Sequence, residues 1–273
     1  MKNFKSLEFI NENPDLRIID VRYDMNDRNY GIMAYRKAHY KGAAFLDLDM
    51  DLAGPVEEHG GRHPLPEMSL LEDKLRSIGL DNASKVLIYD DGDHSSAGRL
   101  WWMLKYYGLR DVYVLNGGFN MLGEELLSGH EETFERGNIT LKPDDKMRAT
   151  YEEVLQFSKE NESFDQVLVD SRSEERYLGI IEPVDRKKGH IRNAKNMFFK
   201  NSFNADGTLK DKEILMKNFS SILSHKDIMV YCGSGVTACS NILVLDELGR
   251  ASRLYPGSFS DFVSYDENTV VKE

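Results

Sequence analysis

The sequence predicts an α/β protein of two similar domains, each a mainly parallel sheet with helices on both faces. Two observations lead to this fold class. Four short motifs occur twice in the same order, and within each copy short Val- and Ile-rich runs alternate with helical stretches. Such alternation is typical of parallel sheets, whose strands are joined by crossover helices. The 273 residues are enough for two domains of ordinary size.

The repeated motifs fix how the two copies align. The offset between matched residues is first 150 and 151, and later 142 and 140, so the first copy carries about nine extra residues between Ala44 and Lys85. The extra segment includes Asp47–Asp49 and Gly61–Pro66, and we expect it to reach the second domain. The matched pairs are Asp20 with Asp170, His39 with His190, Tyr89 with Tyr231, and Gly117 with Gly257.

The elements of each copy follow from local patterns. Two helices are expected at 95–107 and 236–248, each followed by a glycine (Gly108 and Gly249) suited to a left-handed C-cap. Buried strands are expected at five short apolar runs: 18–19, 86–88, 112–115, 167–169 and 228–230. The polar stretch between the copies predicts domains at 1–130 and 147–273, joined by a linker at 131–146.

Composition limits the partners and the compartment. Lys and Arg total 35 against 46 Asp and Glu, a formal charge of -11, which argues against binding to nucleic acid or to anionic membranes. The chain start lacks the apolar region of a signal peptide, and two cysteines are too few for a disulfide framework. We therefore expect a cytoplasmic protein. The seven histidines show no metal-ligand spacing, and neither a metal nor a cofactor is expected.

The segment Tyr231–Ala238 is the strongest candidate for chemistry. It lies between an expected buried strand and an expected helix, where unpaired N–H groups and the helix dipole favour negative charge. Gly233 and Gly235 allow the backbone to curl around one point, which would stabilise a Cys232 thiolate. A cysteine after a strand can also be a small core residue, as we expect for Cys239, but the Gly-Ser-Gly run favours a functional loop.

These motifs resemble those of the tandem rhodanese-domain sulfurtransferases. The resemblance implies that Cys232 takes sulfur from thiosulfate or 3-mercaptopyruvate, forms a persulfide, and passes the sulfur to cyanide or a thiol, a thioredoxin-like protein included. It also implies an inactive first domain, because Asp90 stands where Cys232 stands in the second copy. The loop residues that would hold the small anionic donor and the persulfide are Gly233, Gly235, Val236 and Thr237.

In the mercaptopyruvate branch of this family, a Ser-His-Asp relay lies beside the cysteine. The matching residues here are Ser234, His63 and Asp49. His63 and Asp49 come from the extra segment of the first copy, so the resemblance places the site between the domains. The alternatives are that Ser234 is a turn residue and that His63 lies on the surface.

The resemblance also assigns Arg176 to the charged group of the donor, because a guanidinium group can hold a carboxylate through two hydrogen bonds. The alternative is a surface salt bridge. A second arginine, expected after Glu-Pro, is Val184 here, and Arg186 is the candidate substitute. Val184 argues against mercaptopyruvate, whereas the neutral pair Gly233 and Ser234 argues against thiosulfate. Mercaptopyruvate is favoured, and thiosulfate remains the alternative.

Two other functions are open to a cysteine in such a loop. Cysteine phosphatases that share this fold need an arginine six residues after the nucleophile, where this chain has Ala238, so phosphatase activity is not expected. A persulfide carrier that exchanges sulfur only with a protein partner is the remote alternative, since a two-domain layout favours turnover of small molecules.

Overall fold

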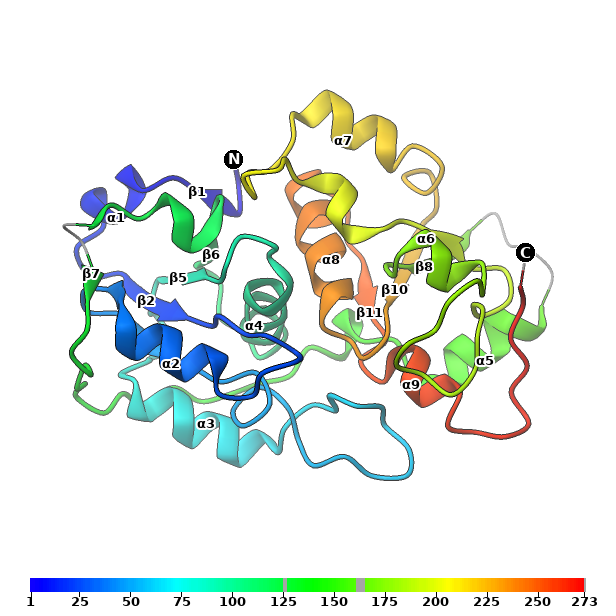
Figure 1. Ribbon diagram of the computed structural model, residues 1–273, viewed down its shortest axis with the longest axis horizontal. Helices are drawn as coiled ribbons and strands as arrows, with labels where there is room; N and C mark the ends of the chain where they lie inside the picture. Colours follow the sequence, from blue (N-terminus) through cyan, green and yellow to red (C-terminus); the bar gives the residue numbers. More distant parts are fainter. Residues whose placement is uncertain (125–126, 161–164, 273) are drawn as a thin grey trace. The chain divides into compact units, whose positions relative to one another are not determined.

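The computed structural model describes residues 1–124, 127–160 and 165–272, and the chain divides into two compact units (Figure 1). The first unit consists of Met1–Gly54, Leu65–Asp144 and Phe203–Leu209. The second consists of Pro55–Pro64, Asp145–Ser202 and Lys210–Glu273. Each half of the chain therefore contributes a short segment to the unit formed mainly by the other half, and the expected extension of the first copy into the second unit is found at residues 55–64.

The first unit is built on a five-stranded parallel sheet with the strand order β1-β6-β5-β2-β4. A separate antiparallel pair joins β3 (His39–Tyr40) to β7 (Leu127–Ser128). The strands of the sheet are β1 (Phe4–Lys5), β2 (Arg17–Asp20), β4 (Ala44–Phe45), β5 (Val86–Tyr89) and β6 (Val112–Leu115). The helices are α1 (Glu8–Glu12), α2 (Tyr30–Lys37), α3 (Met68–Ser77) and α4 (Ser95–Tyr106), with a 3-10 turn at Gly118–Met121.

The sequence explains this packing. All four side chains of β5 are buried, as expected for a central parallel strand covered on both faces. Ile18 and Leu87 pack with Ile10 of α1 on one face. Strand alternation directs Ile88 to the opposite face, and α4 contacts β5 and β6. The helix expected at 95–107 is thus observed as α4.

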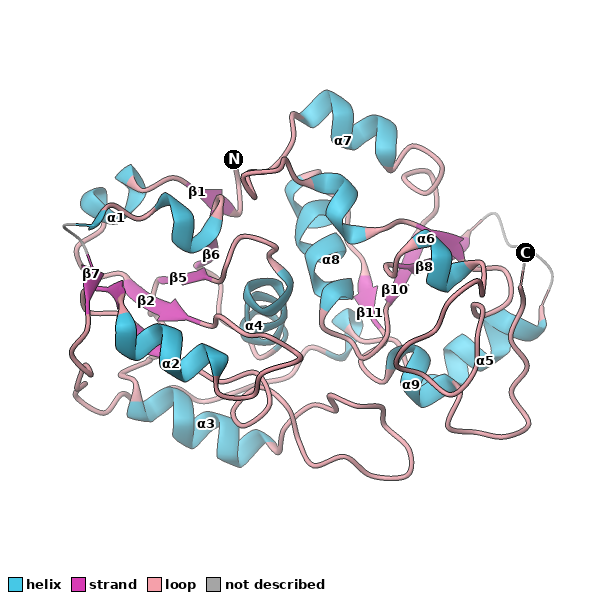
Figure 2. Ribbon diagram, viewed as in Figure 1, coloured by secondary structure: helices cyan, strands magenta, loops and turns pink. Residues whose placement is uncertain are grey.

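The second unit contains a four-stranded parallel sheet with the order β11-β10-β8-β9 (Figure 2). Helices α5 and α9 pack on the face that carries Leu168 and Met229, and α8 contacts β10 and β11. The strands are β8 (Gln166–Asp170), β9 (Lys195–Asn196), β10 (Asp227–Tyr231) and β11 (Arg253–Leu254). The helices are α5 (Tyr151–Lys159), α6 (Glu174–Tyr177), α7 (Lys212–Asn218), α8 (Thr237–Glu247) and α9 (Ser258–Phe262), with 3-10 turns at Asp145–Met147 and Phe199–Ser202.

The same buried ion pair follows the first central strand of each unit. The Nη2–Oδ2 distance is 2.6 Å in both pairs, Arg22 with Asp20 and Arg172 with Asp170. Both arginines also donate to a backbone carbonyl at 2.7 Å and lie over a phenylalanine ring, at 3.9 and 3.8 Å from its centroid. The repeat inferred from the sequence therefore extends to individual contacts.

The expected linker at 131–146 belongs largely to the first unit, which extends to Asp144. Ile139 is fully buried, and its N–H donates to the Leu80 carbonyl at 3.0 Å. Leu141 is also buried, and its N–H donates to Glu72 at 2.9 Å. These two apolar side chains hold the segment on the first unit although its composition is polar. The chain passes to the second unit between Asp144 and Asp145, near the end of the predicted linker.

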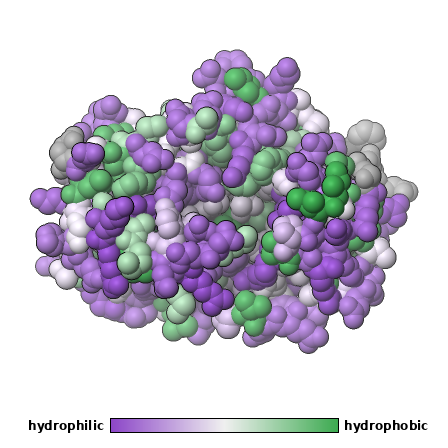
Figure 3. Space-filling model, viewed as in Figure 1, coloured by the Kyte–Doolittle hydropathy of each residue, from purple (hydrophilic) through white to green (hydrophobic). Residues whose placement is uncertain are grey.

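The face shown in Figure 3 is largely hydrophilic, with scattered apolar side chains. This surface agrees with a charged-residue content of 30%. Across the described ranges, no helix combines the length and the apolarity that a bilayer crossing requires.

Candidate active site

Cys232 lies in the turn between β10 and α8 and is 2% exposed. The N–H of Gly235 donates to its Sγ atom at 3.2 Å. Gly235 has φ +76°, and a Cβ atom there would lie 2.3 Å from the Pro256 carbonyl oxygen, so both the backbone conformation and the available space require glycine. The turn is tied to α9, because Cys232 N–H donates to Ser258 Oγ at 3.2 Å and Phe259 N–H donates to the Cys232 carbonyl at 3.0 Å.

The other loop residues singled out from the sequence lie in the same turn. Gly233, Ser234 and Val236 are buried, and Thr237 is half-buried. Val236 is the N-cap of α8 and Thr237 is its first residue. The unpaired N–H groups and the positive end of an 11-residue helix therefore lie next to Cys232, where they favour negative charge on sulfur.

The equivalent turn of the first unit holds a carboxylate. Asp90 follows Tyr89, which pairs with Asp20 in the same register in which Tyr231 pairs with Asp170 in the second unit. Its buried carboxylate accepts hydrogen bonds from the side chain of Ser96 and from the backbone N–H groups of Gly92, His94 and Ala97. Burial raises the pKa of Asp90, and the N–H groups of Ala97 and Gly92 act in the opposite direction.

His63 and Ser234 are brought together within the second unit, with 2.7 Å between His63 Nδ1 and Ser234 Oγ. Three further hydrogen bonds attach residues 55–64 to the end of the chain: Gly60 N–H to Asp261 at 2.7 Å, Arg62 N–H to Ser260 Oγ at 3.1 Å, and His59 Nδ1 with Ser264 Oγ at 2.7 Å. His63 is therefore held in place by its own segment and is not a detached surface histidine.

Asp49, the third residue of the expected relay, belongs to the first unit. Its carboxylate accepts hydrogen bonds from the Tyr23 hydroxyl at 3.2 and 3.4 Å. Burial, together with the negative charge of Asp49, raises the pKa of Tyr23. The assignment of Asp49 to the relay thus depends on the resemblance.

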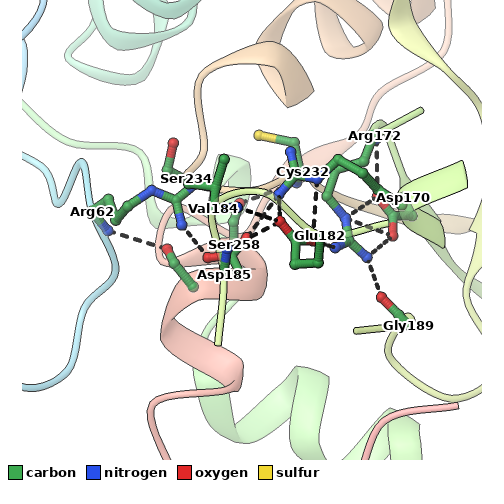
Figure 4. A network of polar contacts seen from close by, with 12 residues as sticks. Arg62, Asp170, Arg172, Glu182, Val184, Asp185, Gly189, Cys232, Ser234 and Ser258 are labelled. Carbon is green, nitrogen blue, oxygen red and sulfur yellow. Dashed lines mark hydrogen bonds and ion pairs between the residues drawn. The ribbon is translucent and has the colours of Figure 1, made fainter. Parts of the chain in front are cut away.

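Arg176 belongs to a network of charges that borders Gly233, the residue after Cys232. Figure 4 shows Arg172, Glu182 and Asp185 of this network beside the Cys232 turn. Its guanidinium group donates to Glu182 at 2.8 and 3.1 Å and to Asp185 at 2.9 Å. Glu182 also accepts from Arg172 and from the N–H groups of Val184 and Asp185. Burial would raise the pKa of Glu182, but these donors hold it below its ordinary value. Arg176 is therefore held by two buried carboxylates, with part of its side chain exposed, and is not part of a loose surface salt bridge.

Arg62 is a member of this network that the sequence analysis missed. Its Nη1 donates to one oxygen of Asp185, whose other oxygen accepts from Arg176. A Cβ atom at Gly233 would lie 2.9 Å from Arg62 Nη2 and 3.5 Å from Arg176 Nη2, so both guanidinium groups border the residue after Cys232. One hint of its role was present in the sequence. The loop after Cys232 is neutral and only Arg176 was assigned to the donor, so the expected anion-binding site had too few cations.

Arg186, the expected substitute for the missing second arginine, makes its contacts away from the Cys232 turn. Its Nε donates to the Val263 carbonyl, and its Nη2 pairs with the exposed Asp266 at 3.2 Å. These contacts direct the guanidinium group of Arg186 to the end of the chain. Val184 itself is 37% exposed and contributes only its backbone N–H to Glu182. The second guanidinium group beside the loop is that of Arg62.

Gly235→Ala tests the geometry of the turn, with Gly249→Ala as a matched control. The two glycines have φ of +76° and +77°, but no atom lies within 4 Å of a Cβ at Gly249. Both variants should lose about 1 kcal/mol of stability to backbone strain, and Gly235→Ala should lose more because its Cβ would meet the Pro256 carbonyl oxygen. Urea unfolding measures both losses. Only Gly235→Ala should also displace the turn and slow the reaction of Cys232 with a sulfur donor, by roughly 100-fold. Equal reaction rates in the two variants would contradict this account of the turn.

Comparisons with known proteins agree with the geometry. The family model for the rhodanese-like domain matches residues 5–124 and 151–265. The chain is 37% identical to a probable 3-mercaptopyruvate sulfurtransferase of Pseudomonas aeruginosa over 260 residues (92% of this chain, 90% of the relative), and 35% identical to a thiosulfate sulfurtransferase of Bos taurus over 267 residues (91% and 85%). The crystal structure of the 3-mercaptopyruvate sulfotransferase SseA from Escherichia coli superposes with a TM-score of 0.83 at 28% identity, covering 95% of this chain and all of that one. With two matched domains, this chain belongs to the tandem rhodanese-domain sulfurtransferase family.

Proposed function

We propose that this sulfurtransferase takes the sulfur of 3-mercaptopyruvate on Cys232 and passes it to a thiol or to cyanide. The observation that carries the proposal is the turn at Cys232, where the Gly235 N–H donates to Sγ beside the hydrogen-bonded pair His63 and Ser234. The loop side chains at 233 and 234 carry no charge, which favours a donor whose own charge lies away from its sulfur atom. Thiosulfate, the donor named for several relatives, is the alternative.

In the first half-reaction the Cys232 thiolate attacks the sulfur of mercaptopyruvate. The S–S bond forms as the C–S bond breaks, and the electron pair of the C–S bond goes to the methylene carbon, giving the enolate of pyruvate. The proton of the donor thiol is transferred to that carbon, so that the products are pyruvate and a Cys232 persulfide anion. The Gly235 N–H donates to Sγ, and we expect it and the N–H groups at the start of α8 to stabilise the negative charge of the persulfide.

Ser234 and His63 are the candidates for moving this proton. The 2.7 Å hydrogen bond between them supplies a hydroxyl group next to the nucleophile and an imidazole that can accept or return a proton. Asp49 is proposed, from the resemblance, to orient the imidazole. Arg176 binds the donor carboxylate, because its position beside Gly233 lies one residue from Cys232.

In the second half-reaction a thiolate or cyanide attacks the terminal sulfur, and the Cys232 thiolate leaves. A thioredoxin-like protein is the proposed protein acceptor, since a small exposed thiolate could reach the turn.

Asp90 cannot form a persulfide, so we propose that the first domain is not catalytic. Both cysteines are free thiols, which fits the proposed reducing, cytoplasmic location.

Mass spectrometry after incubation with mercaptopyruvate tests the nucleophile. The peptide that contains Cys232 should gain the mass of one sulfur atom, and cyanide or a thiol should remove it. Cys232→Ser should abolish turnover. Cys239→Ser should retain most of it, because the Cys239 thiol is fully buried and donates to the Gly235 carbonyl. Equal loss in both variants would replace the single-cysteine mechanism with one that uses two thiols.

Steady-state kinetics separates the roles of Ser234 and Arg176. Ser234→Ala removes the hydroxyl partner of His63 and should lower kcat with mercaptopyruvate roughly 100-fold, with a small change in KM. Arg176→Ala removes a cation that holds the donor and should mainly raise KM, roughly tenfold or more. Ser220→Ala, at an exposed site in the same unit, is the control and should change neither constant. A kcat unchanged by Ser234→Ala would exclude the relay.

A further inference from the structure

Two guanidinium groups with unused donors border the residue after the nucleophile. Among the described residues, the side chain of Arg62 donates only through Nη1, to Asp185. Arg176 donates through Nε and Nη2, and its Nη1 makes no hydrogen bond to those residues. A Cβ atom at Gly233 would lie 2.9 Å from Arg62 Nη2 and 3.6 Å from Arg176 Nη1. The absence of a side chain at Gly233 leaves room for both groups beside Cys232.

The charge of the network shows why Arg176 alone is a poor anion site. Without Arg62, the network contains two guanidinium groups (Arg172 and Arg176) and three carboxylates. Its net charge would be −1 when all of these groups are ionised. Such an excess of negative charge opposes the entry of an anion. Arg62 brings the count to three against three, so the unused N–H groups can attract an anion. The three carboxylates are Asp170, Glu182 and Asp185.

We propose that Arg62 is a substrate-binding residue that, together with Arg176, holds the carboxylate of a 2-oxo acid sulfur donor. This inference rests on the proposed function and supplies the cation that is missing at Val184. Asp185 binds one arginine through each of its oxygens and thereby sets the spacing of the two guanidinium groups. The side chains of Arg62 and Arg176 are 31% and 19% exposed, whereas that of Asp185 is 2% exposed. An entering anion therefore meets the guanidinium groups before it meets the carboxylate.

Alkylation of Cys232 by a matched pair of reagents tests this role without sulfur transfer. 3-Bromopyruvate and bromoacetone carry the same bromomethyl ketone, and only 3-bromopyruvate has the carboxylate. The ratio of their rates at Cys232, followed by peptide mass spectrometry, reports binding of the carboxylate, because changes in thiolate reactivity cancel. Arg62→Gln should lower the bromopyruvate rate roughly tenfold or more and leave the bromoacetone rate within about twofold. Arg62→Lys should give an intermediate ratio.

The control is Arg136→Gln, which removes an exposed arginine paired with the exposed Asp73 and should leave the ratio unchanged. A ratio for Arg62→Gln equal to that of the wild type overturns the inference. A parallel fall in both rates also overturns it, because Arg62 would then act through the shape of the turn. If the wild-type protein forms no persulfide from mercaptopyruvate, the proposed function fails, while the alkylation ratio still decides whether Arg62 binds a carboxylate.

Discussion

The turn from a central strand into the following helix presents backbone N–H groups to a single point, and an electron-rich atom must lie there to accept them. The chain builds this turn twice. In the first unit the carboxylate of Asp90 accepts three backbone N–H groups and the Ser96 hydroxyl. In the second unit Cys232 Sγ accepts the Gly235 N–H. In the first unit the donors of the turn are therefore satisfied by the turn's own carboxylate. In the second unit the same arrangement can stabilise a thiolate and then a persulfide.

Segments exchanged between the two halves of the chain complete both turns. In the first unit, Gly207 lies against Gly92, where a Cβ atom would be 2.6 Å from the Gly92 carbonyl oxygen, and its own carbonyl is hydrogen-bonded to His94 at 2.7 Å. In the second unit, residues 55–64 bring His63 to Ser234 and Arg62 to Asp185. The extra length of the first copy therefore supplies functional groups that the Cys232 turn lacks in its own sequence.

Much of the fold could be predicted from the sequence because its signals are local. The apolar runs of β5 and β10, and the glycines after α4 and α8, act through neighbours within a few residues. The repeat then placed Asp90 and Cys232 at equivalent positions, and the change in offset located the exchanged segment. The buried Ile139 was the exception, since an apolar residue in a polar stretch gives a weak signal of packing.

The charged part of the site could be predicted less well. The ion pair of Arg62 with Asp185 joins residues 123 apart in sequence, so it depends on the packing of the exchanged segment. Arg186 is near Val184 in sequence, but its side chain contacts Val263 and Asp266 instead. The neutral loop and the missing arginine at Val184 indicated that a cation was needed, and only the tertiary structure identifies which arginine can supply it.

The central claim is that a neutral loop, lined by backbone N–H groups and bordered by arginines one residue away, selects a donor whose charge lies apart from its sulfur. A dianion such as thiosulfate would have to bring its charge to the turn itself, with a desolvation cost of several kcal/mol in a partly dry site. The most direct test is kcat/KM of the wild-type protein for 3-mercaptopyruvate and for thiosulfate, with cyanide as the common acceptor at one pH and ionic strength. The account predicts the higher value for 3-mercaptopyruvate, and a higher value for thiosulfate would contradict it.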